Sequence, residues 1–516
     1  MFIRRRRNKS GTVSVAVVDK SSGKFRELKT IGVSSDPREL SELERKARAW
    51  MNERTGQLAL DFDESDKAIR SAREVFSQIE RTLHNTPQVI LNGIYDSIGF
   101  GAIGDDILRH LVIARVCEPL SKVATVEYLK SYFDEDIRLH NIYRYMDRLY
   151  SSQRERVQRI SVAHTMKVLG GRIGLVFYDV TTLYFESKPN PDDTLRQAGF
   201  SKDGKTSESH IVLGLLVSED GYPLSYSIFN GCQYEGRTMI PIIDDFVQRF
   251  GLEDFVVVAD SGLMSAKNVA LLESAGYKYI IGARIKSESP ELRAWMMSVE
   301  WTDGAIAECR RTGAQRLIVG YSEARARKNA WNRNKGVERL RKAYAKGTLT
   351  KQGVNRRGYN KFLDISKDIE VSINEDKIAE DSRWDGLKGY VTNTSLPASD
   401  VIAQYHGLWV VERAFRIGKG TLEMRPIFHF TEKRIEAHIC ICFVAYKVYK
   451  ELERRMREIG MNMSVDKLLA IAKTVTTLRI KLPNGQLHSE TLYTTPQQEA
   501  IRPLVETLAR DARTRG

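Results

Sequence analysis

The spacing of apolar and polar residues changes several times along the chain. Residues 1–35 are predicted to form a small β hairpin, because TVSVAVVD alternates with period two, KSSGK is a turn sequence and FRELKTIG resumes the strand. From residue 36 to 169, charged and apolar residues are interleaved at helical spacing. We therefore expect a mainly helical region there.

Strand patterns dominate residues 170–285. RIGLVFYDVTTLYFES is dense in β-branched and aromatic residues, and HIVLGLLVSEDGYPLSYSIFNG predicts two strands joined at Asp220-Gly221. Helical segments then alternate with the apolar strands FVVVAD and YKYIIGAR. Three antiparallel strands followed by alternating helices and parallel strands predict a mixed α/β sheet of the ribonuclease H kind.

The second half of the chain begins with an interruption of this pattern. Residues 286–383 contain basic runs with little periodicity and are predicted to be an insertion domain, partly β, between strands of the sheet. Residues 384–460 return to the core with the strand GLKGYVTNTSL and two helices. Residues 461–516 are predicted to hold a hairpin at Asn484-Gly485 and a terminal helix, and are a candidate dimerisation region.

Length and charge narrow the class of protein. A chain of 516 residues with 42% hydrophobic residues is predicted to fold into about three well-packed domains. Its formal charge of +14 favours a polyanionic partner, which would be nucleic acid or an anionic membrane, over the alternative of a soluble basic protein without such a partner. The helical region 36–169 is a candidate DNA-binding domain, although any solvated helical bundle would have the same pattern.

Segments that would direct the chain to a membrane are not found. No run approaches 18 apolar residues, and the basic start MFIRRRRNKS is not followed by the apolar part of a signal peptide. Five scattered cysteines indicate a reducing compartment, and Cys440 and Cys442 are interpreted as core residues. We therefore expect no membrane association and a cytoplasmic protein.

One predicted helix has an unusual distribution of charge. In YHGLWVVERAFRIGKG, residues 405–420, apolar side chains cover most of the circumference, so the helix is expected to be buried. Charged side chains are rarely buried without partners. The polar side chains on its remaining stripe therefore need an explanation, and they are Tyr405, Glu412, Arg413, Arg416 and Lys419.

Two aspartates in the predicted sheet suggest what this stripe faces. Asp179 lies in mid-strand, where aspartate is unfavourable, and Asp260 ends a strand at the carboxyl edge, where α/β sheets bind ligands. With Glu412 they would form an oxygen-rich site suited to Mg²⁺ or Mn²⁺, with two ions flanking a phosphodiester. Arg416, Lys419 and Tyr405 would then contact DNA phosphates. The alternatives are capping roles for the aspartates and an internal ion pair of Glu412 with Arg416.

These residues resemble the bacterial insertion-sequence transposases of the DDE class. Tyr405, Glu412 and Lys419 match the Tyr-x2-Arg-x3-Glu-x6-Lys signature, and YDVTTLYFES and VVVADSG resemble the two aspartate motifs. The family's arginine is replaced by Leu408, and Arg413 or Arg416 are candidate substitutes. The resemblance covers Asp179 to about Lys450.

The resemblance implies an enzyme that binds the inverted ends of its element, cleaves them and joins the 3′ ends to target DNA. It implies Asp179, Asp260 and Glu412 as metal ligands, Tyr405 and Lys419 as phosphate contacts, and a homodimer on double-stranded DNA. The resulting fold class is a ribonuclease H-like core interrupted by a partly β insertion and preceded by a mainly helical DNA-binding region. A ribonuclease H-like nuclease and a non-catalytic DNA-binding protein are the alternatives.

Two tryptophans in the basic insertion offer a further DNA contact. Trp331 stands in the basic run KNAWNRNKG, and Trp384 precedes a strand. An exposed aromatic ring could stack on a displaced base, whereas tryptophan is more often buried in a core. Of the two, Trp331 is the candidate for DNA binding.

Overall fold

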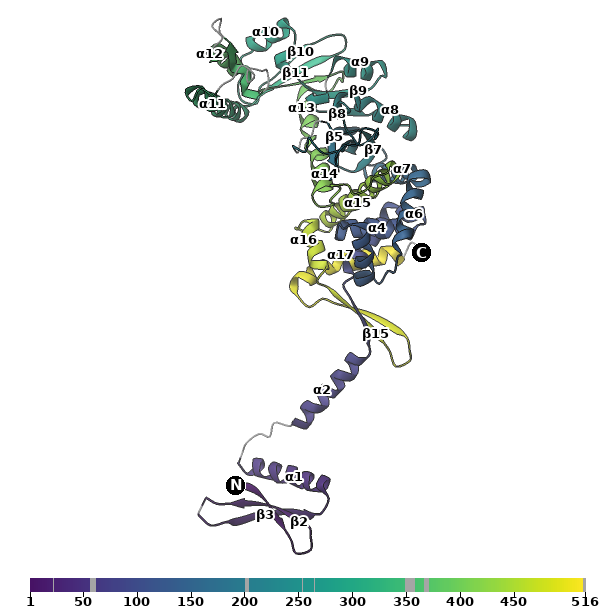
Figure 1. The fold of residues 1–516 in the computed structure, drawn as a ribbon, viewed down its shortest axis with the longest axis vertical. Helices are drawn as coiled ribbons and strands as arrows, with labels where there is room; N and C mark the ends of the chain where they lie inside the picture. The colour runs from purple at the N-terminus through teal and green to yellow at the C-terminus, as the bar shows by residue number, and fades with distance from the viewer. Residues whose placement is uncertain are drawn as a thin grey trace. The chain divides into compact units, whose positions relative to one another are not determined.

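The computed structural model describes residues 1–21, 23–55, 62–199, 204–252, 254–263, 265–348, 358–365 and 371–513. Its internal contacts divide the chain into two compact units (Figure 1). The first comprises Met1–Thr82 with Leu478–Glu490, and the second comprises Leu83–Thr477 with Thr491–Gly516. Among the described residues, no helix has both the length and the apolar character that crossing a membrane requires.

The first unit begins with a three-stranded antiparallel sheet covered by one helix. The elements are β1 (Phe2–Arg7), β2 (Val13–Asp19), β3 (Arg26–Ser34) and α1 (Pro37–Thr55). The predicted hairpin is confirmed by the pairing of β2 with β3, but the basic run before it, FIRRRR, is a third strand paired with β2. Val15, Val17 and Ala47 form the small core between sheet and helix.

The rest of the first unit combines segments from both ends of the chain. It contains α2 (Phe62–Ser77) and most of a second three-stranded sheet, which is formed by β4 (Ile79–Leu83), β15 (Thr476–Lys481) and β16 (Leu487–Leu492) in the order β16-β15-β4. The hairpin predicted at Asn484-Gly485 joins β15 to β16, and Gly485 has the positive φ of 83° that the turn requires.

An eight-stranded mixed sheet is the centre of the second unit, in the order β10-β11-β14-β9-β8-β5-β6-β7. Its strands are β5 (Leu175–Tyr184), β6 (His210–Ser218), β7 (Pro223–Asn230), β8 (Val256–Ala259), β9 (Lys278–Ala283), β10 (Ile306–Arg310), β11 (Arg316–Tyr321) and β14 (Leu387–Thr392). β5 pairs antiparallel with β6 and parallel with β8, as the sequence pattern predicts.

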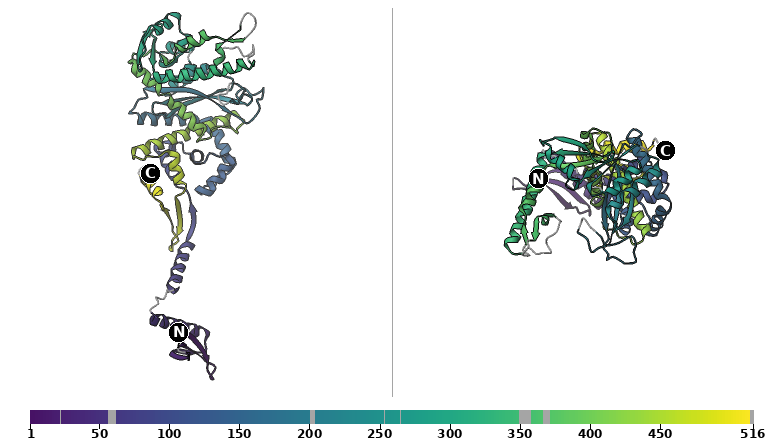
Figure 2. Two further views of the ribbon diagram at one scale, coloured as in Figure 1. Left: turned by 90° about the vertical axis from the view of Figure 1, so that its left-hand side faces the viewer. Right: turned by 90° about the horizontal axis from the view of Figure 1, so that it is seen from above.

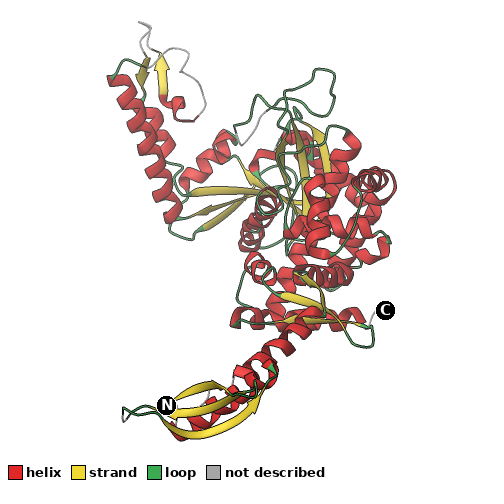
Figure 3. Cartoon of the chain, turned by 60° about the horizontal axis from the view of Figure 1, so that its bottom comes forward, coloured by secondary structure: helices red, strands yellow, loops and turns green. Residues whose placement is uncertain are grey.

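The interpretation of residues 286–383 as one insertion domain is wrong in part. β10 and β11 extend the main sheet beyond β14, because the apolar stretch of β11, Leu317–Val319, is buried against both faces. Only α11 (Glu323–Ala345), β12 (Leu363–Ile365), β13 (Val371–Ile373) and α12 (Glu375–Ser382) build a separate small core, around Val337, Leu340 and Phe362. The long helix α11 with its short β ribbon is visible in Figure 3.

Helices cover both faces of the main sheet (Figure 2). One face packs against α8 (Met239–Phe250), α9 (Ala266–Ser274) and α10 (Pro290–Ser298). The other packs against α13 (Ala398–His406), α14 (Trp409–Lys419) and α15 (Glu432–Glu458). Because successive residues of a strand point to opposite faces, each strand contributes to both cores.

The predicted boundary of a helical domain at residue 169 is not observed. α15 is buried around its whole circumference, between the sheet and a layer of helices from both ends of the unit, so all of them share one core. These helices are α3 (Thr86–Ile98), α4 (Asp106–Cys117), α5 (Lys122–Tyr128), α6 (Leu139–Arg148), α7 (Arg154–Val168), α16 (Val465–Ala472) and α17 (Pro496–Arg513). Residues 83–169 and the C-terminal helices are therefore parts of the second unit, and Cys440 and Cys442 are core residues as predicted.

Candidate active site

Both predicted aspartates lie on the face of the main sheet that α13 and α14 cover. Along β5, Phe177 belongs to the core on that face while Tyr178 belongs to the opposite core, so Asp179 points to the α13–α14 side. Along β8, Val258 belongs to the core on the α13–α14 side and Ala259 to the opposite core, so Asp260, which follows Ala259, points to the α13–α14 side. The two carboxylates therefore share one face.

The register of the strands places the two aspartates at the same level. Tyr178 pairs with Ala259 in the parallel ladder, so Asp179 and Asp260 are each one residue further along. Neighbouring strands are about 4.8 Å apart. The sheet thus brings the two acids side by side at the carboxyl end of β8, although 81 residues separate them in sequence.

The level of the sheet at which Asp179 and Asp260 lie continues across β9 and β14 to an aromatic residue. Ala259 pairs with Ile281 on β9, so Gly282 lies beside Asp260, and Gly282 pairs with Tyr390 on β14. The ring of Tyr405, from α13, packs edge-on against Tyr390 with 4.8 Å between centroids. Its hydroxyl donates a hydrogen bond of 2.8 Å to Oδ1 of Asp260.

Glycine at position 282 makes room for this hydrogen bond. A Cβ atom there would lie 2.4 Å from the Tyr405 hydroxyl. The absence of a side chain at this position of β9 lets the Tyr405 hydroxyl approach the strand and reach Asp260. Burial, and next the negative charge of Asp260, raise the pKa of Tyr405, so the hydroxyl keeps its proton and remains a donor.

The helix predicted over residues 405–420 is two helices. α13 ends at His406 and α14 begins at Trp409, and the connection has i→i−3 bonds such as Leu408 N–H to Tyr405 C=O. At this connection the Phe177 ring lies against Gly407, where a Cβ would be 2.4 Å away, so a larger residue would not fit. Tyr405 and Glu412 therefore come from different helices, which was not predicted.

Lys388 is a member of the site that the sequence analysis missed. It lies on β14 on the same face, and its ammonium is 4.5 Å from the centre of the Tyr405 ring. Burial and the nearby Arg325 lower the pKa of Lys388, while the charges of Asp260 and Glu412 act in the opposite direction. The available signal was a lysine inside the otherwise apolar strand GLKGYVT.

The predicted metal ligands fit a divalent cation by chemistry but are not gathered around one point. Asp179 accepts a bond from the N–H of Val180, Asp260 accepts from Tyr405, and Glu412 is exposed on α14. Among the described residues, no three Asp, Glu, His or Cys side chains are close enough to hold one ion. The donor set is nevertheless all oxygen, which suits Mg²⁺ or Mn²⁺.

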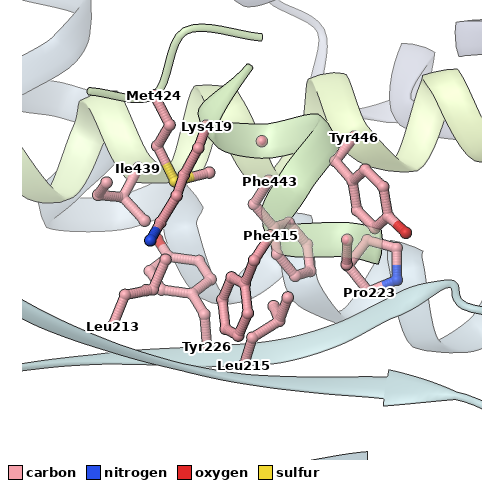
Figure 4. Close-up of a pocket in the computed structure, with 12 residues that line it drawn as sticks. Leu213, Leu215, Pro223, Tyr226, Phe415, Lys419, Met424, Ile439, Phe443 and Tyr446 are labelled. Atoms are coloured by element: carbon pink, nitrogen blue, oxygen red, sulfur yellow. The ribbon is translucent and has the colours of Figure 1, made fainter. Parts of the chain in front are cut away.

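The basic residues of α14 have different environments. Arg413 forms a bidentate ion pair with Glu453 of α15, whereas Arg416 is exposed. Lys419 lines an apolar pocket between the sheet and the helices α14 and α15 (Figure 4). The alternative pairing of Glu412 with Arg416 does not occur in the structure, where both side chains are exposed.

Of the two tryptophans, Trp331 is the exposed one. Its side chain is 60% exposed on α11, and the Lys335 ammonium lies 4.6 Å from its ring. Trp384 packs against the core of the main sheet. The expectation that tryptophan is usually buried therefore holds for Trp384 and not for Trp331.

Comparison with known proteins identifies the family. A model of the transposase DDE domain matches residues 170–447, more than half of the chain, so this chain belongs to the transposase DDE domain family. No curated protein matches the chain.

Two solved structures resemble it at low identity. The piggyBac transposase synaptic complex with hairpin DNA, determined by cryo-EM, is similar over 80% of this chain and 73% of that chain, with 9% identity and a TM-score of 0.40. The Mos1 transposase paired-end complex with the left transposon end is similar over 31% of this chain and 53% of that chain, with 10% identity and a TM-score of 0.16.

As a member of this family the chain is an enzyme that cleaves and transfers DNA strands. DDE transposases generally use divalent metal ions.

Proposed function

We propose that the chain is the transposase of a bacterial insertion sequence, which binds the terminal inverted repeats and moves the element by cut-and-paste transposition. The observation that supports this most directly is the register that sets Asp179 beside Asp260 on adjacent parallel strands, within a transposase DDE domain. The protein would act in the bacterial cytoplasm, associated with the nucleoid when bound to DNA.

Asp179, Asp260 and Glu412 are the proposed ligands of Mg²⁺ or Mn²⁺, with two ions in the active complex. Bound there, the ions would activate the attacking oxygen and stabilise the leaving oxygen of the phosphodiester. The proposal requires the three side chains to rotate toward one another. The exposure of Asp260 and Glu412 is compatible with this rotation.

The neighbouring side chains have roles that do not depend on the ions. The Tyr405 hydroxyl restricts the orientation of the Asp260 carboxylate by donating to Oδ1. Lys388 provides a positive charge beside the two acids and Tyr405, where a phosphate would add negative charge. Tyr405 is also the proposed donor to a DNA phosphate, a role in which it would exchange Asp260 for DNA.

We further propose which surfaces hold the DNA. Arg416, which is exposed one turn after Glu412, is the preferred phosphate contact of α14. Arg413 and Lys419 are secondary candidates, because Arg413 is paired with Glu453 and Lys419 lines the apolar pocket. Trp331 would stack on a displaced base. Residues 36–169 would contribute to binding the ends, and residues 461–516 to a homodimer in the DNA complex.

Strand mapping on natural DNA tests the proposal. The full chain is incubated with a duplex carrying both flanks of its reading frame, with Mg²⁺ or with a chelator, and the cleaved strands are mapped. Cleavage is expected at the ends of an inverted repeat, only with the metal. Asp179→Ala, Asp260→Ala and Glu412→Ala should each abolish cleavage and leave binding nearly unchanged. Glu300→Ala, which removes an exposed acid outside the site, is the control.

Each arm of this experiment can contradict a separate part of the proposal. A triad variant that cleaves at the rate of the Glu300→Ala control is not a ligand. Metal-dependent cleavage without any preference for the flanks would indicate a general nuclease.

A further inference from the structure

In the part of the chain that the structure describes, no hydrophobic core joins a helix to one face of the β1–β3 sheet. α1 covers the other face, on which Ile3, Val15, Val17 and Leu28 pack against it. The pairing of β1 and β2 sets Phe2 opposite Val18, Arg4 opposite Ala16, and Arg6 opposite Ser14. We call the side of the sheet opposite α1 the open face. Its residues are Phe2, Arg4, Arg6, Ser14, Ala16, Val18, Glu27, Thr30 and Val33, of which Ala16 and Val18 are buried beneath the longer side chains around them.

The arginines of β1 divide between the two faces. Arg5 points to α1, where Glu44 accepts its hydrogen bond. Arg4 and Arg6 lie on the open face, and both side chains are exposed. Glu27, the acid on this face, accepts a bond from Thr30. The two guanidinium groups in the middle of β1 are thus presented away from the helix, two residues apart along one strand.

Aromatic rings stand at one end of the open face. The rings of Phe2 and Phe25 pack edge to face at 6.1 Å and are 41% and 57% exposed. The guanidinium of Arg4 and the ammonium of Lys20 lie 5.4 Å and 5.1 Å from the Phe25 ring. Arg4 and Lys20 therefore both make cation–π contacts with the Phe25 ring.

The charge around this sheet favours a polyanion as partner. Residues 1–34 contain nine Lys and Arg against two Asp and Glu, a formal net charge of +7, which is half of the +14 of the whole chain. Arg4 and Arg6 lie on the outer strand β1, which pairs with β2, and a two-stranded β ribbon fits the roughly 12 Å width of the DNA major groove. Arginine is also the residue that most often binds guanine there through two hydrogen bonds.

We propose that the open face of β1–β3 binds in the major groove of the element ends, and that Arg4 and Arg6 contact base edges there. This inference rests on the proposed function, because it takes the terminal repeat as the DNA. It assigns recognition of the DNA sequence to the sheet of the first 34 residues. The sequence pattern had instead predicted the helical region 36–169 as the DNA-binding domain.

Binding by the full chain tests this assignment without any cleavage. Affinities are measured in chelator at fixed salt for a duplex of the terminal repeat and for a scrambled duplex of the same composition. Arg4→Ala/Arg6→Ala should reduce the preference for the repeat about tenfold or more. Arg4→Lys/Arg6→Lys keeps the charge but not the bidentate geometry, so it should keep affinity for the scrambled duplex and still lose preference. Lys46→Ala/Arg48→Ala, which removes two exposed charges from α1, is the control.

The outcomes separate this inference from the proposed function. Preference for the repeat that survives in Arg4→Ala/Arg6→Ala would overturn the inference and leave the transposase proposal intact. An equal loss of preference for the repeat in the α1 control and in Arg4→Ala/Arg6→Ala would show that only the positive charge matters, and would also overturn the inference. Binding to phosphatidylserine vesicles that requires Arg4 and Arg6, with DNA preference unchanged, would identify the face as a membrane contact instead. A wild-type chain without preference would contradict both proposals, and melting temperatures verify that each variant is folded.

Discussion

At the scale of single residues, the site depends on a contact between a helix and the sheet. Tyr405 reaches Asp260 because position 282 has no side chain, and the ammonium of Lys388 lies over the ring of the same tyrosine. Burying an ammonium group costs free energy unless it is compensated. A lysine in a buried strand beside two acids is therefore better explained by function than by stability.

We predict opposite effects of Lys388→Met on activity and on stability. The substitution removes a positive charge next to Asp260 and Glu412 and replaces a desolvated ammonium by an apolar chain of similar length. Strand cleavage at saturating DNA should slow about tenfold or more, because a positive charge beside the reacting phosphate stabilises the negative charge that develops there. The melting temperature of Lys388→Met should be unchanged or higher than that of the wild type.

Tyr405→Phe serves as the companion variant in the same assays. It removes only the hydroxyl that binds Asp260 and that is proposed to donate to a DNA phosphate, so cleavage of the bound DNA should fall and DNA affinity should weaken by the one lost bond. A loss of affinity with unchanged cleavage of the bound DNA would leave Tyr405 as a phosphate contact alone. A lowered melting temperature of Lys388→Met would mean that the lysine serves the fold.

At the scale of elements, α14 has one arginine for the fold and one available for a ligand. Arg413 is joined to Glu453 on α15 by two hydrogen bonds and is half-buried, whereas Arg416, three residues later, is exposed. The two positions therefore form a matched pair on one helix, with the same side chain in different surroundings.

Arg413→Ala and Arg416→Ala should have complementary effects. The first leaves Glu453 without its partner on α14, and should lower the free energy of unfolding by about 1–3 kcal/mol with little change in DNA affinity. The second should weaken DNA binding and reduce its dependence on salt, with stability unchanged. Urea titrations and fluorescence anisotropy measure the two effects. If Arg416→Ala leaves the salt dependence as it is, α14 does not contact phosphate through that residue.

At the scale of the whole second unit, α15 joins the sheet to the helical layer through buried charges. Glu451 is 1% exposed, and it accepts bonds from Tyr222 at the β6–β7 turn and from Arg454, with His164 of α7 at 3.7 Å. Burial alone would raise the pKa of Glu451, but its contacts with His164, Arg454 and Tyr222 outweigh burial and lower the pKa to about 2.

The lowered pKa of Glu451 predicts a pH-dependent contribution to stability. Because the folded state favours the carboxylate, the stabilisation is complete above the ordinary glutamate pKa of about 4.5 and is lost as the pH falls toward 2. Glu451→Gln should therefore be less stable than the wild type by about 3–5 kcal/mol near neutral pH, with the difference shrinking below about pH 4.5. Urea unfolding over a pH series measures it. A difference that does not change with pH would exclude the carboxylate as its source.

Local patterns in the sequence determined much of the second unit. Strand periodicity and the Asp220-Gly221 turn predicted β5, β6 and β7 in order, and the alternation after them predicted β8 and β9. The positions of Asp179 in a strand and Asp260 at a strand end follow from the same patterns, because each depends only on neighbouring residues. The family could likewise be inferred from these short motifs.

Contacts between distant segments were decided only by the tertiary structure. No local pattern shows that β10 and β11 join the main sheet, that the Phe177 ring packs against Gly407 between two helices, or that residues 83–169 share the core of α15. Lys388 and Arg413 acquire their roles from partners on other elements, as does the open face of β1–β3 from the helix that covers only its opposite side. Periodicity records which side of an element is apolar, whereas the identity of the partner on that side depends on the packing of the whole chain.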